Sequence, residues 1–187
     1  MGDVLWHTQM SLDGFIAGPG DAMEWAFEDW GVGDSDETID GVVRSTGALL
    51  VGRRTQDVED REQAGFYGGA YHGPFFTLRH NPPPEPPVVK GVTGQFLDVP
   101  IEEAVKVAKD AADGANVVVL GANVAKQCLE ADLMDEVLVH VAPVLLGDGV
   151  RLFSRPDGSP IRLERTSVQE SGQLTALRFR VRKAGSG

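Results

Sequence analysis

The side chains best suited to hold a charged ligand are a few cations in an otherwise acidic chain. The 187 residues include 17 Lys and Arg against 28 Asp and Glu, a formal net charge of −11. The buried apolar run 48–51 opens into a turn made of Gly52, Arg53, Arg54 and Thr55. Guanidinium groups grip phosphate oxygens through paired bonds, glycine admits close backbone approach, and threonine can cap a following helix. The turn therefore predicts a phosphate-binding corner, with a solvated surface corner as the alternative.

A second turn of the same kind follows another short apolar run. Residues 117–120 are apolar and mostly β-branched, which is typical of a strand buried on both faces of a parallel sheet. Helical spacing then begins, so the connecting turn contains Gly121, Ala122, Asn123 and Val124. Free N–H groups and the helix dipole at such a turn favour an anion such as phosphate. The alternative is a strand–helix unit that only builds the sheet.

A third strand end also carries positive charge. Residues 75–78 are typical of a strand, and this strand would end at Leu78, Arg79 and His80. Several cationic or glycine-rich turns at the strand ends of one sheet are stronger evidence for a ligand site than a single such turn. Together they indicate a binding site for a phosphorylated ligand.

An acidic residue follows the first predicted strand, residues 4–10. Asp13 stands just beyond its end, where ligands sit in open α/β sheets, so it is a candidate for orienting a substrate or relaying a proton. A turn aspartate that bonds its own backbone is the alternative. Glu24 and Trp25, in the acidic and aromatic segment 21–30, are weaker candidates for the substrate side. That segment would either wall a pocket for a flat heterocycle or pack as an irregular flap.

Periodicity predicts the elements that must position these side chains. Residues 36–46 indicate a helix with Ser35 as its N-cap, and residues 101–108 indicate an amphipathic helix. The last part of the chain predicts a long apolar strand, residues 136–144, and an antiparallel hairpin over residues 162–182. We expect a single domain over residues 1–183 and a frayed tail over residues 184–187.

Composition and motifs disfavour several classes of protein. The negative charge disfavours nucleic acid and anionic membranes as partners, and one cysteine, Cys128, excludes an internal disulfide framework and is expected in the core. The start of the chain has no signal-like pattern and no run could span a bilayer, so a cytoplasmic protein is expected. Hydrolase and metal-site motifs are missing, no metal site is expected, and the histidines are scattered at His7, His72, His80 and His140. His7 and His140 lie on predicted strands and are expected to be satisfied core or face residues.

Four segments in order resemble the signatures of a known family. They are residues 10–17, 52–55, 117–125 and 135–153, and the match extends from Val4 to about Arg182. The chain resembles the dihydrofolate-reductase-like family, which includes the reductase domain of bacterial riboflavin biosynthesis. The resemblance implies an α/β fold with a mixed, mostly parallel sheet flanked by helices and a C-terminal antiparallel hairpin. It also implies NADPH bound across the strand ends, usually in a homodimer.

The same resemblance assigns roles to the turns. It implies that residues 52–55 contact cofactor phosphates, that residues 78–80 lie by the adenosine 2′-phosphate, and that residues 121–124 take the pyrophosphate. NADPH is expected rather than NADH, because the 2′-phosphate needs a cation where NAD enzymes place a carboxylate. The implied activity is hydride transfer to a C=O or C=N of a small polar substrate, related to 5-amino-6-(5-phosphoribosylamino)uracil reductase.

Two departures from the family pattern keep other functions open. The family commonly has two successive glycines where this chain has Gly121 and Ala122, and a methyl group there would crowd the pyrophosphate. This departure favours a non-catalytic NADP(H)-binding protein as an alternative. A dihydrofolate reductase is a further alternative, but Trp30 falls near the position of its pterin-binding carboxylate, so dihydrofolate is not the expected substrate.

Overall fold

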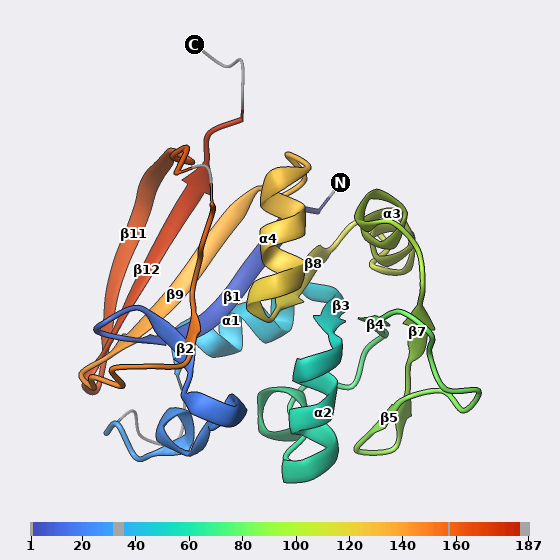
Figure 1. Cartoon of the computed structure of the whole chain (residues 1–187), viewed down its shortest axis with the longest axis horizontal. Helices are drawn as coiled ribbons and strands as arrows, with labels where there is room; N and C mark the ends of the chain where they lie inside the picture. The colour runs from blue at the N-terminus through green and yellow to red at the C-terminus, as the bar shows by residue number, and fades with distance from the viewer. Residues whose placement is uncertain (1, 32–35, 157, 184–187) are drawn as a thin grey trace.

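A single eight-stranded sheet forms the centre of the computed structural model, which describes residues 2–31, 36–156 and 158–183 (Figure 1). From one edge to the other its strands are β11 (Leu163–Ser171), β12 (Leu174–Val181), β9 (Glu136–Ala142), β1 (Val4–Ser11), β8 (Asn116–Leu120), β3 (Thr46–Gly52), β4 (Phe75–Leu78) and β7 (Gln95–Leu97). The strands from β9 to β7 run parallel, and the β11–β12 hairpin joins β9 antiparallel. The predicted mixed, mostly parallel sheet with a C-terminal antiparallel hairpin is confirmed.

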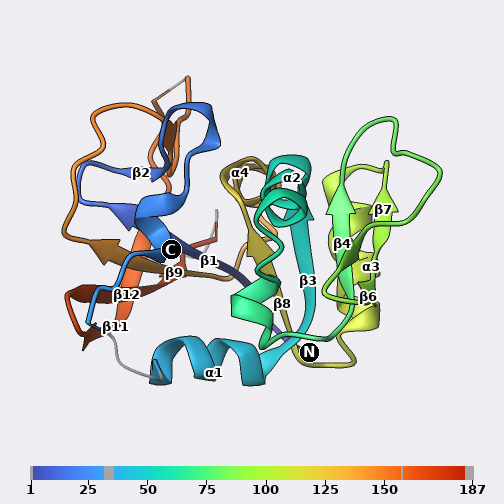
Figure 2. The same cartoon turned by 90° about the horizontal axis from the view of Figure 1, so that it is seen from below.

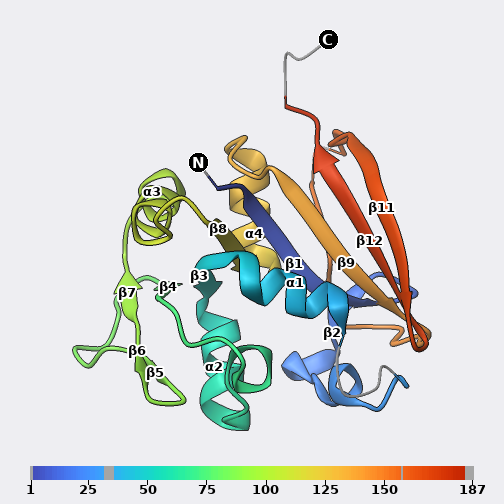
Figure 3. The same cartoon turned by 180° about the vertical axis from the view of Figure 1, so that it is seen from behind.

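Helices cover both faces of this sheet. The helices α3 (Ile101–Ala111) and α4 (Ala122–Glu130) lie on one face, in front of the sheet in Figure 1. Helix α1 (Glu37–Ser45) lies across the opposite face, as Figure 3 shows. Helix α2 (Arg53–Glu62) leaves the end of β3. None of the helices in the described parts of the chain is long and apolar enough to cross a membrane.

Short elements fill the connections between the larger ones. Two small antiparallel pairs complete the strands, namely β2 (Phe15–Ala17) with β10 (Val150–Arg151), and β5 (Val88–Val89) with β6 (Val92–Thr93). Single turns of 3₁₀ helix are found at Pro19–Asp21, Glu24–Phe27 and Phe66–Gly69.

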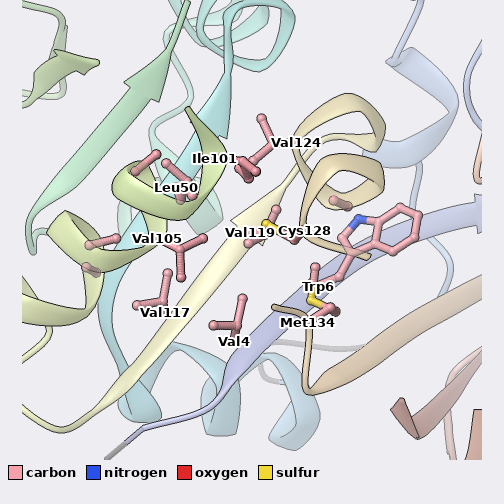
Figure 4. Packing of buried hydrophobic residues seen from close by; sticks show 14 of the residues in the cluster. Val4, Trp6, Leu50, Ile101, Val105, Val117, Val119, Val124, Cys128 and Met134 are labelled. Atoms are coloured by element: carbon pink, nitrogen blue, oxygen red, sulfur yellow. The ribbon is translucent and has the colours of Figure 1, made fainter. Parts of the chain in front are cut away.

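The apolar run of β8 is continuous because both faces of this strand are buried. Val117 and Val119 pack into the core beneath α3 and α4, while Val118 packs into the core on the α1 side. Figure 4 shows the first of these cores, with Val119 next to Cys128 of α4. Burial raises the pKa of the Cys128 thiol to about 12, so it stays protonated at neutral pH. The predictions of a buried strand and of a core cysteine are both confirmed.

Some predicted boundaries and caps are wrong. The N-cap of α1 is Asp36, whose carboxylate accepts hydrogen bonds from the N–H groups of Thr38 and Ile39. The proposed cap Ser35 and the predicted tail, residues 184–187, lie outside the described residues. Strand β9 ends at Ala142 rather than at residue 144, because Pro143 has no N–H group to donate to a strand ladder.

The two-sided core predicts a large difference between two leucines. Leu50 of β3 is fully buried in the core under α3, whereas the side chain of Leu145 is 70% exposed. We expect Leu50→Ala to lower the free energy of unfolding by roughly 2–5 kcal/mol, and Leu145→Ala to change it by less than about 0.5 kcal/mol. Urea denaturation measures both values. Similar losses for the two variants would contradict the packing described above.

Candidate functional site

A cavity of about 840 Å³ lies at the carboxyl ends of the parallel strands. All the residues that the sequence assigned to cofactor binding line it, namely Gly52, Arg53, Arg54, Thr55, Leu78, Arg79, His80, Gly121, Ala122, Asn123 and Val124. They come together because β8, β3 and β4 are neighbours in the sheet and end on the same side. The volume is in the range of small-molecule and cofactor sites.

Two helix N-termini without side-chain caps face this cavity. Helix α2 begins after Gly52 and helix α4 begins after Gly121, and neither has a capping side chain or an acidic residue in its first turn. Helix α1 differs, because Asp36 caps it and Glu37 lies in its first turn. The free N–H groups and positive dipole ends of α2 and α4 are therefore available to an anion. Figure 1 shows α2 below α4, and Figure 2 shows both helices on the side of the sheet away from α1.

The two strand-to-helix turns also pack against each other. Gly121 has a φ of +97°, and a Cβ placed there would lie 2.7 Å from Thr55 Oγ1. The Thr55 hydroxyl in turn donates to the Leu120 carbonyl oxygen at 3.5 Å. A Cβ at Gly52 would lie 3.3 Å from Val124 Cγ2. Thr55 thus joins the two turns and does not cap α2, which corrects the role predicted for it, since the N-cap is Gly52.

Two arginines of the first turn of α2 keep most of their surface in solvent. The Arg53 guanidinium is 3.5 Å from Asp57 and that of Arg54 is 3.6 Å from Asp21, with the arginine side chains 60% and 67% exposed. Ion pairs as open as these contribute little to stability. Both guanidinium groups are therefore free to turn toward a bound phosphate.

Arg79 is the cation most firmly placed at the end of β4. Its guanidinium lies 5.3 Å from the ring centroid of Phe96, and its buried Nε has no hydrogen-bond partner among the described residues. His80 is 94% exposed, and its Nδ1 lies 2.9 Å from an oxygen of Asp98. Hydrogen bonds from His80 and from the Asn81 N–H lower the pKa of Asp98. Because His80 already faces a carboxylate, Arg79 is the stronger anion ligand of the two.

The sequence did not single out two further cations of the cavity. Lys126 of α4 and Arg151 of β10 both line it, and the Arg151 guanidinium lies 4.7 Å from the ring centroid of Phe15. Arg151 reaches the cavity because β10 pairs with β2 beyond the end of β1. This pairing joins segments far apart in the sequence, so only the fold could reveal it.

Asp13 has a structural role in the turn after β1. Its carboxylate accepts hydrogen bonds from Ser11 Oγ at 2.6 Å, from the Leu146 N–H at 3.1 Å and from the Gly147 N–H at 2.7 Å. The Ser11 hydroxyl, with these N–H groups, lowers the pKa of Asp13 to about 2. Asp13 does not line the cavity. A proton donor near neutral pH needs a raised pKa, so both the position and the pKa argue against the role predicted from sequence.

The other residues predicted for the substrate side also lie away from the cavity lining. Glu24 is exposed, and Trp25 is buried against Ala142 and Leu174. Trp25 therefore packs the flap, which was the alternative considered for this segment. From the same segment, Met23 and Phe27 do line the cavity.

Polar residues of the central strands form the inner wall of the cavity. His7 and Gln9 of β1 and His140 of β9 line it together with Ile39 of α1. Burial, with a contribution from the neighbouring His140, lowers the pKa of His7 to about 3, and burial also lowers the pKa of His140. Both imidazoles are therefore neutral at neutral pH. Both histidines are buried, as expected of core residues, and His7 Nδ1 lies 2.9 Å from the Tyr67 hydroxyl. They are only partly satisfied, because His7 Nε2 and both ring nitrogens of His140 lack partners among the described residues.

The strand order and the cavity at the strand ends define a dihydrofolate-reductase-like fold. Residues 73–177, more than half of the chain, match the model of the RibD C-terminal domain family. The chain therefore belongs to the RibD C-terminal domain family. Among curated protein sequences, none matches the chain significantly.

Solved structures share the fold at low sequence identity. A Shewanella sp. PV-4 protein assigned to riboflavin biosynthesis superposes with a TM-score of 0.80 at 19% identity, over 97% of this chain and 99% of that one. The second structure is the Thermotoga maritima diaminohydroxyphosphoribosylaminopyrimidine deaminase/5-amino-6-(5-phosphoribosylamino)uracil reductase. Its TM-score is 0.71 at 16% sequence identity, and the match covers 96% of this chain and 56% of that one. The Saccharomyces cerevisiae riboflavin biosynthesis reductase Rib7 has a TM-score of 0.62 at 15% sequence identity, and the match covers 97% of this chain and 90% of that one. The chain thus spans about half the length of the Thermotoga protein.

The hydrogen bonds of Asp13 predict a pH-dependent contribution to stability. Its folded-state pKa is depressed, so the stabilisation is present above the ordinary pKa of 3.8 and is lost as the pH falls toward about 2. We expect Asp13→Asn to lower the midpoint of urea unfolding at neutral pH. The difference in midpoint between this variant and the wild type should shrink as the pH falls from 3.8 toward about 2. The exposed Asp113 provides a control, Asp113→Asn, which should show no such gap. A difference in urea midpoint between Asp13→Asn and the wild type that does not change with pH would contradict this role for Asp13.

The contact between the two turns predicts a specific cost at Gly121. Gly121→Ala and the control Gly114→Ala both place a side chain at positive φ, +97° and +85°, but only the first would meet another atom within 4 Å. Strain of about 1–3 kcal/mol is expected in both. The additional loss in Gly121→Ala should disappear when Thr55→Ala is combined with it. Thermal unfolding of the three variants tests this, and equal losses at Gly121 and Gly114 would count against the contact.

Proposed function

We propose that the protein is an NADPH-dependent oxidoreductase that reduces a C=O or C=N carbon of a small polar substrate. The observation that carries the proposal is the meeting of two uncapped helix N-termini and the guanidinium of Arg79, which lies over Phe96, in one cavity. Membership of the RibD C-terminal domain family supports it, as do structural neighbours that are reductases of riboflavin biosynthesis. A substrate related to 5-amino-6-(5-phosphoribosylamino)uracil is accordingly the first to test.

The residues at the strand ends fit a phosphorylated dinucleotide. In this proposal the free N–H groups at the starts of α2 and α4 hold the pyrophosphate, and Arg53 and Arg54 neutralise its charge. Arg79, whose guanidinium lies over Phe96 at the edge of the cavity, holds the 2′-phosphate. Glycine at Gly121 leaves the backbone open to the cavity, where the turn has no space for a side chain.

The cofactor, when bound, supplies the hydride, and the protein supplies alignment and exclusion of water. The β2–β10 pair lies over one side of the cavity, with Arg151 stacked on Phe15. The inner wall of β1 and β9 would face the substrate. Because Asp13 is ionised and lies outside the cavity lining, we assign the proton transfer to water or to the substrate side of the cavity instead.

One observation favours a binding protein without catalysis as the second candidate. Ala122 lines the cavity where the family commonly has glycine. Ala122 begins α4, however, and is not among the positive-φ residues, so the backbone there does not need glycine. Binding of NADPH without turnover of any substrate would support this candidate. The homodimer and the cytoplasmic location stay predictions.

The assignment of Arg79 to the 2′-phosphate predicts a change in cofactor preference. We expect Arg79→Ala to weaken NADPH binding by roughly 10- to 150-fold, because a charge-assisted hydrogen bond is worth about 1.5–3 kcal/mol, and to leave NADH binding nearly unchanged. Arg53→Ala should weaken both, because both cofactors carry the pyrophosphate. Fluorescence titration measures the dissociation constants.

The matched control is Arg165→Ala, at an exposed arginine of β11 outside the cavity lining. It should bind both cofactors like the wild type. If the wild type bound neither NADPH nor NADH, the proposed reductase activity would be contradicted. If Arg79→Ala weakened the binding of NADPH and NADH equally, the assignment of Arg79 to the 2′-phosphate would be wrong.

A further inference from the structure

A carboxylate shares one end of the cavity with Arg79. Asp98 directly follows β7, the edge strand that pairs with β4, and Figure 2 shows these two strands side by side. Asp98 lines the cavity together with Arg79, whose guanidinium lies over the ring of Phe96, two residues before Asp98. The Asp98 side chain is 42% exposed, so a ligand in the cavity can reach it. The same end of the cavity thus presents both a cation and an anion.

Hydrogen bonds from the end of β4 hold this carboxylate in place. One oxygen of Asp98 lies 2.9 Å from His80 Nδ1, and the other accepts from the Asn81 N–H at 3.1 Å. A further bond joins the same two strand ends, from the Arg79 N–H to the Leu97 carbonyl oxygen at 3.0 Å. Because both of its oxygens are engaged, the carboxylate is fixed at the end of β4, beside the residues expected to hold a phosphate.

The same contacts keep Asp98 ionised. The hydrogen bond from His80, followed by that from the Asn81 N–H, lowers the pKa of Asp98. An ionised carboxylate only accepts hydrogen bonds, so Nδ1 of His80 must donate to it, and a neutral His80 then has an unprotonated Nε2. That nitrogen is an acceptor and cannot donate to a phosphate. Arg79 therefore faces the negative charge of Asp98 without a second donor from a neutral His80.

This pair of charges acts in opposite ways on the two forms of an adenosine ribose. A phosphate monoester carries a charge of roughly −1.5 to −2 near pH 7, so Asp98 repels a 2′-phosphate while Arg79 attracts it. A free 2′-hydroxyl is a donor, and a carboxylate is the group that NAD-binding sites offer to that hydroxyl. Arg79 thus suits the phosphorylated ribose, and Asp98 suits the ribose that carries no phosphate.

We propose that Asp98 is a specificity-determining residue for the cofactor, whose carboxylate accepts from the ribose hydroxyl of NADH and limits the preference for NADPH. The proposal rests on the proposed function, in which Arg79 takes the 2′-phosphate. The protein accordingly binds both reduced cofactors, and the balance between Arg79 and Asp98 sets which of them binds more tightly. Removal of the arginine favours NADH, and removal of the carboxylate favours NADPH.

The ratio of two dissociation constants tests this role. Fluorescence titrations with NADPH and NADH would compare the wild type with Asp98→Asn, which removes the charge and keeps an oxygen acceptor for the Asn81 N–H. The matched control is Asp110→Asn, which makes the same change in net charge at an exposed aspartate of α3 outside the cavity lining. We expect Asp98→Asn to raise the preference for NADPH over NADH roughly tenfold and the control to match the wild type.

Ionic strength separates the effect of the charge from a structural effect. Salt screens repulsion between exposed charges, so the difference in NADPH affinity between the wild type and Asp98→Asn should shrink between about 0.01 M and about 1 M salt. A variant that only distorts the site would instead bind both cofactors more weakly at every salt concentration. That result would contradict the role of Asp98 in specificity.

A measurement on the wild type keeps the test valid even if Asp98→Asn is unstable. The carbon-13 signal of the Asp98 carboxyl group reports its pKa, which NADP⁺ should raise and NAD⁺ should not, because the 2′-phosphate disfavours a second negative charge beside it. Equal titration curves with the two cofactors, or an unchanged ratio of dissociation constants in Asp98→Asn, would overturn the inference alone. Binding of neither cofactor to the wild type would overturn the proposed function together with the inference.

Discussion

The site depends on the packing of two strand-to-helix turns against each other. Thr55 of one turn fills the space that a side chain at Gly121 would need, and Val124 of the other lies against Gly52. This contact brings the free N–H groups of two helices to one place, although the helices are separated by about 60 residues of chain. Neighbouring parallel strands make the contact possible, because β3 and β8 end at the same level.

The cavity combines two kinds of surface that suit different parts of one reaction. At the strand ends, an acidic protein concentrates Arg53, Arg54 and Arg79, a charge distribution that favours a phosphorylated ligand. On the inner wall, His7 and His140 are kept neutral by burial. The cavity lining therefore carries cations at the strand ends and neutral imidazoles on the inner wall.

The sequence predicted what depends on local pattern and missed what depends on tertiary contact. The buried strand at residues 117–120 and the glycine turns could be predicted, since runs and turn residues are local signals. The role of Asp13 could not, because its partners Leu146 and Gly147 are more than 130 residues away. The wall also escaped prediction, because the pairing of Gln9 with His140 depends on strand register. The local signals were the polar run His7–Gln9 in β1 and His140 among the apolar residues of β9.

The amide N–H groups at the starts of α2 and α4 provide the most direct measurement. If one dinucleotide phosphate bridges the two turns, adding NADP⁺ to nitrogen-15-labelled protein shifts the amide signals of residues 53–55 and 122–124 together, along one saturation curve. Shifts confined to one of these turns, or found in neither, would contradict the account.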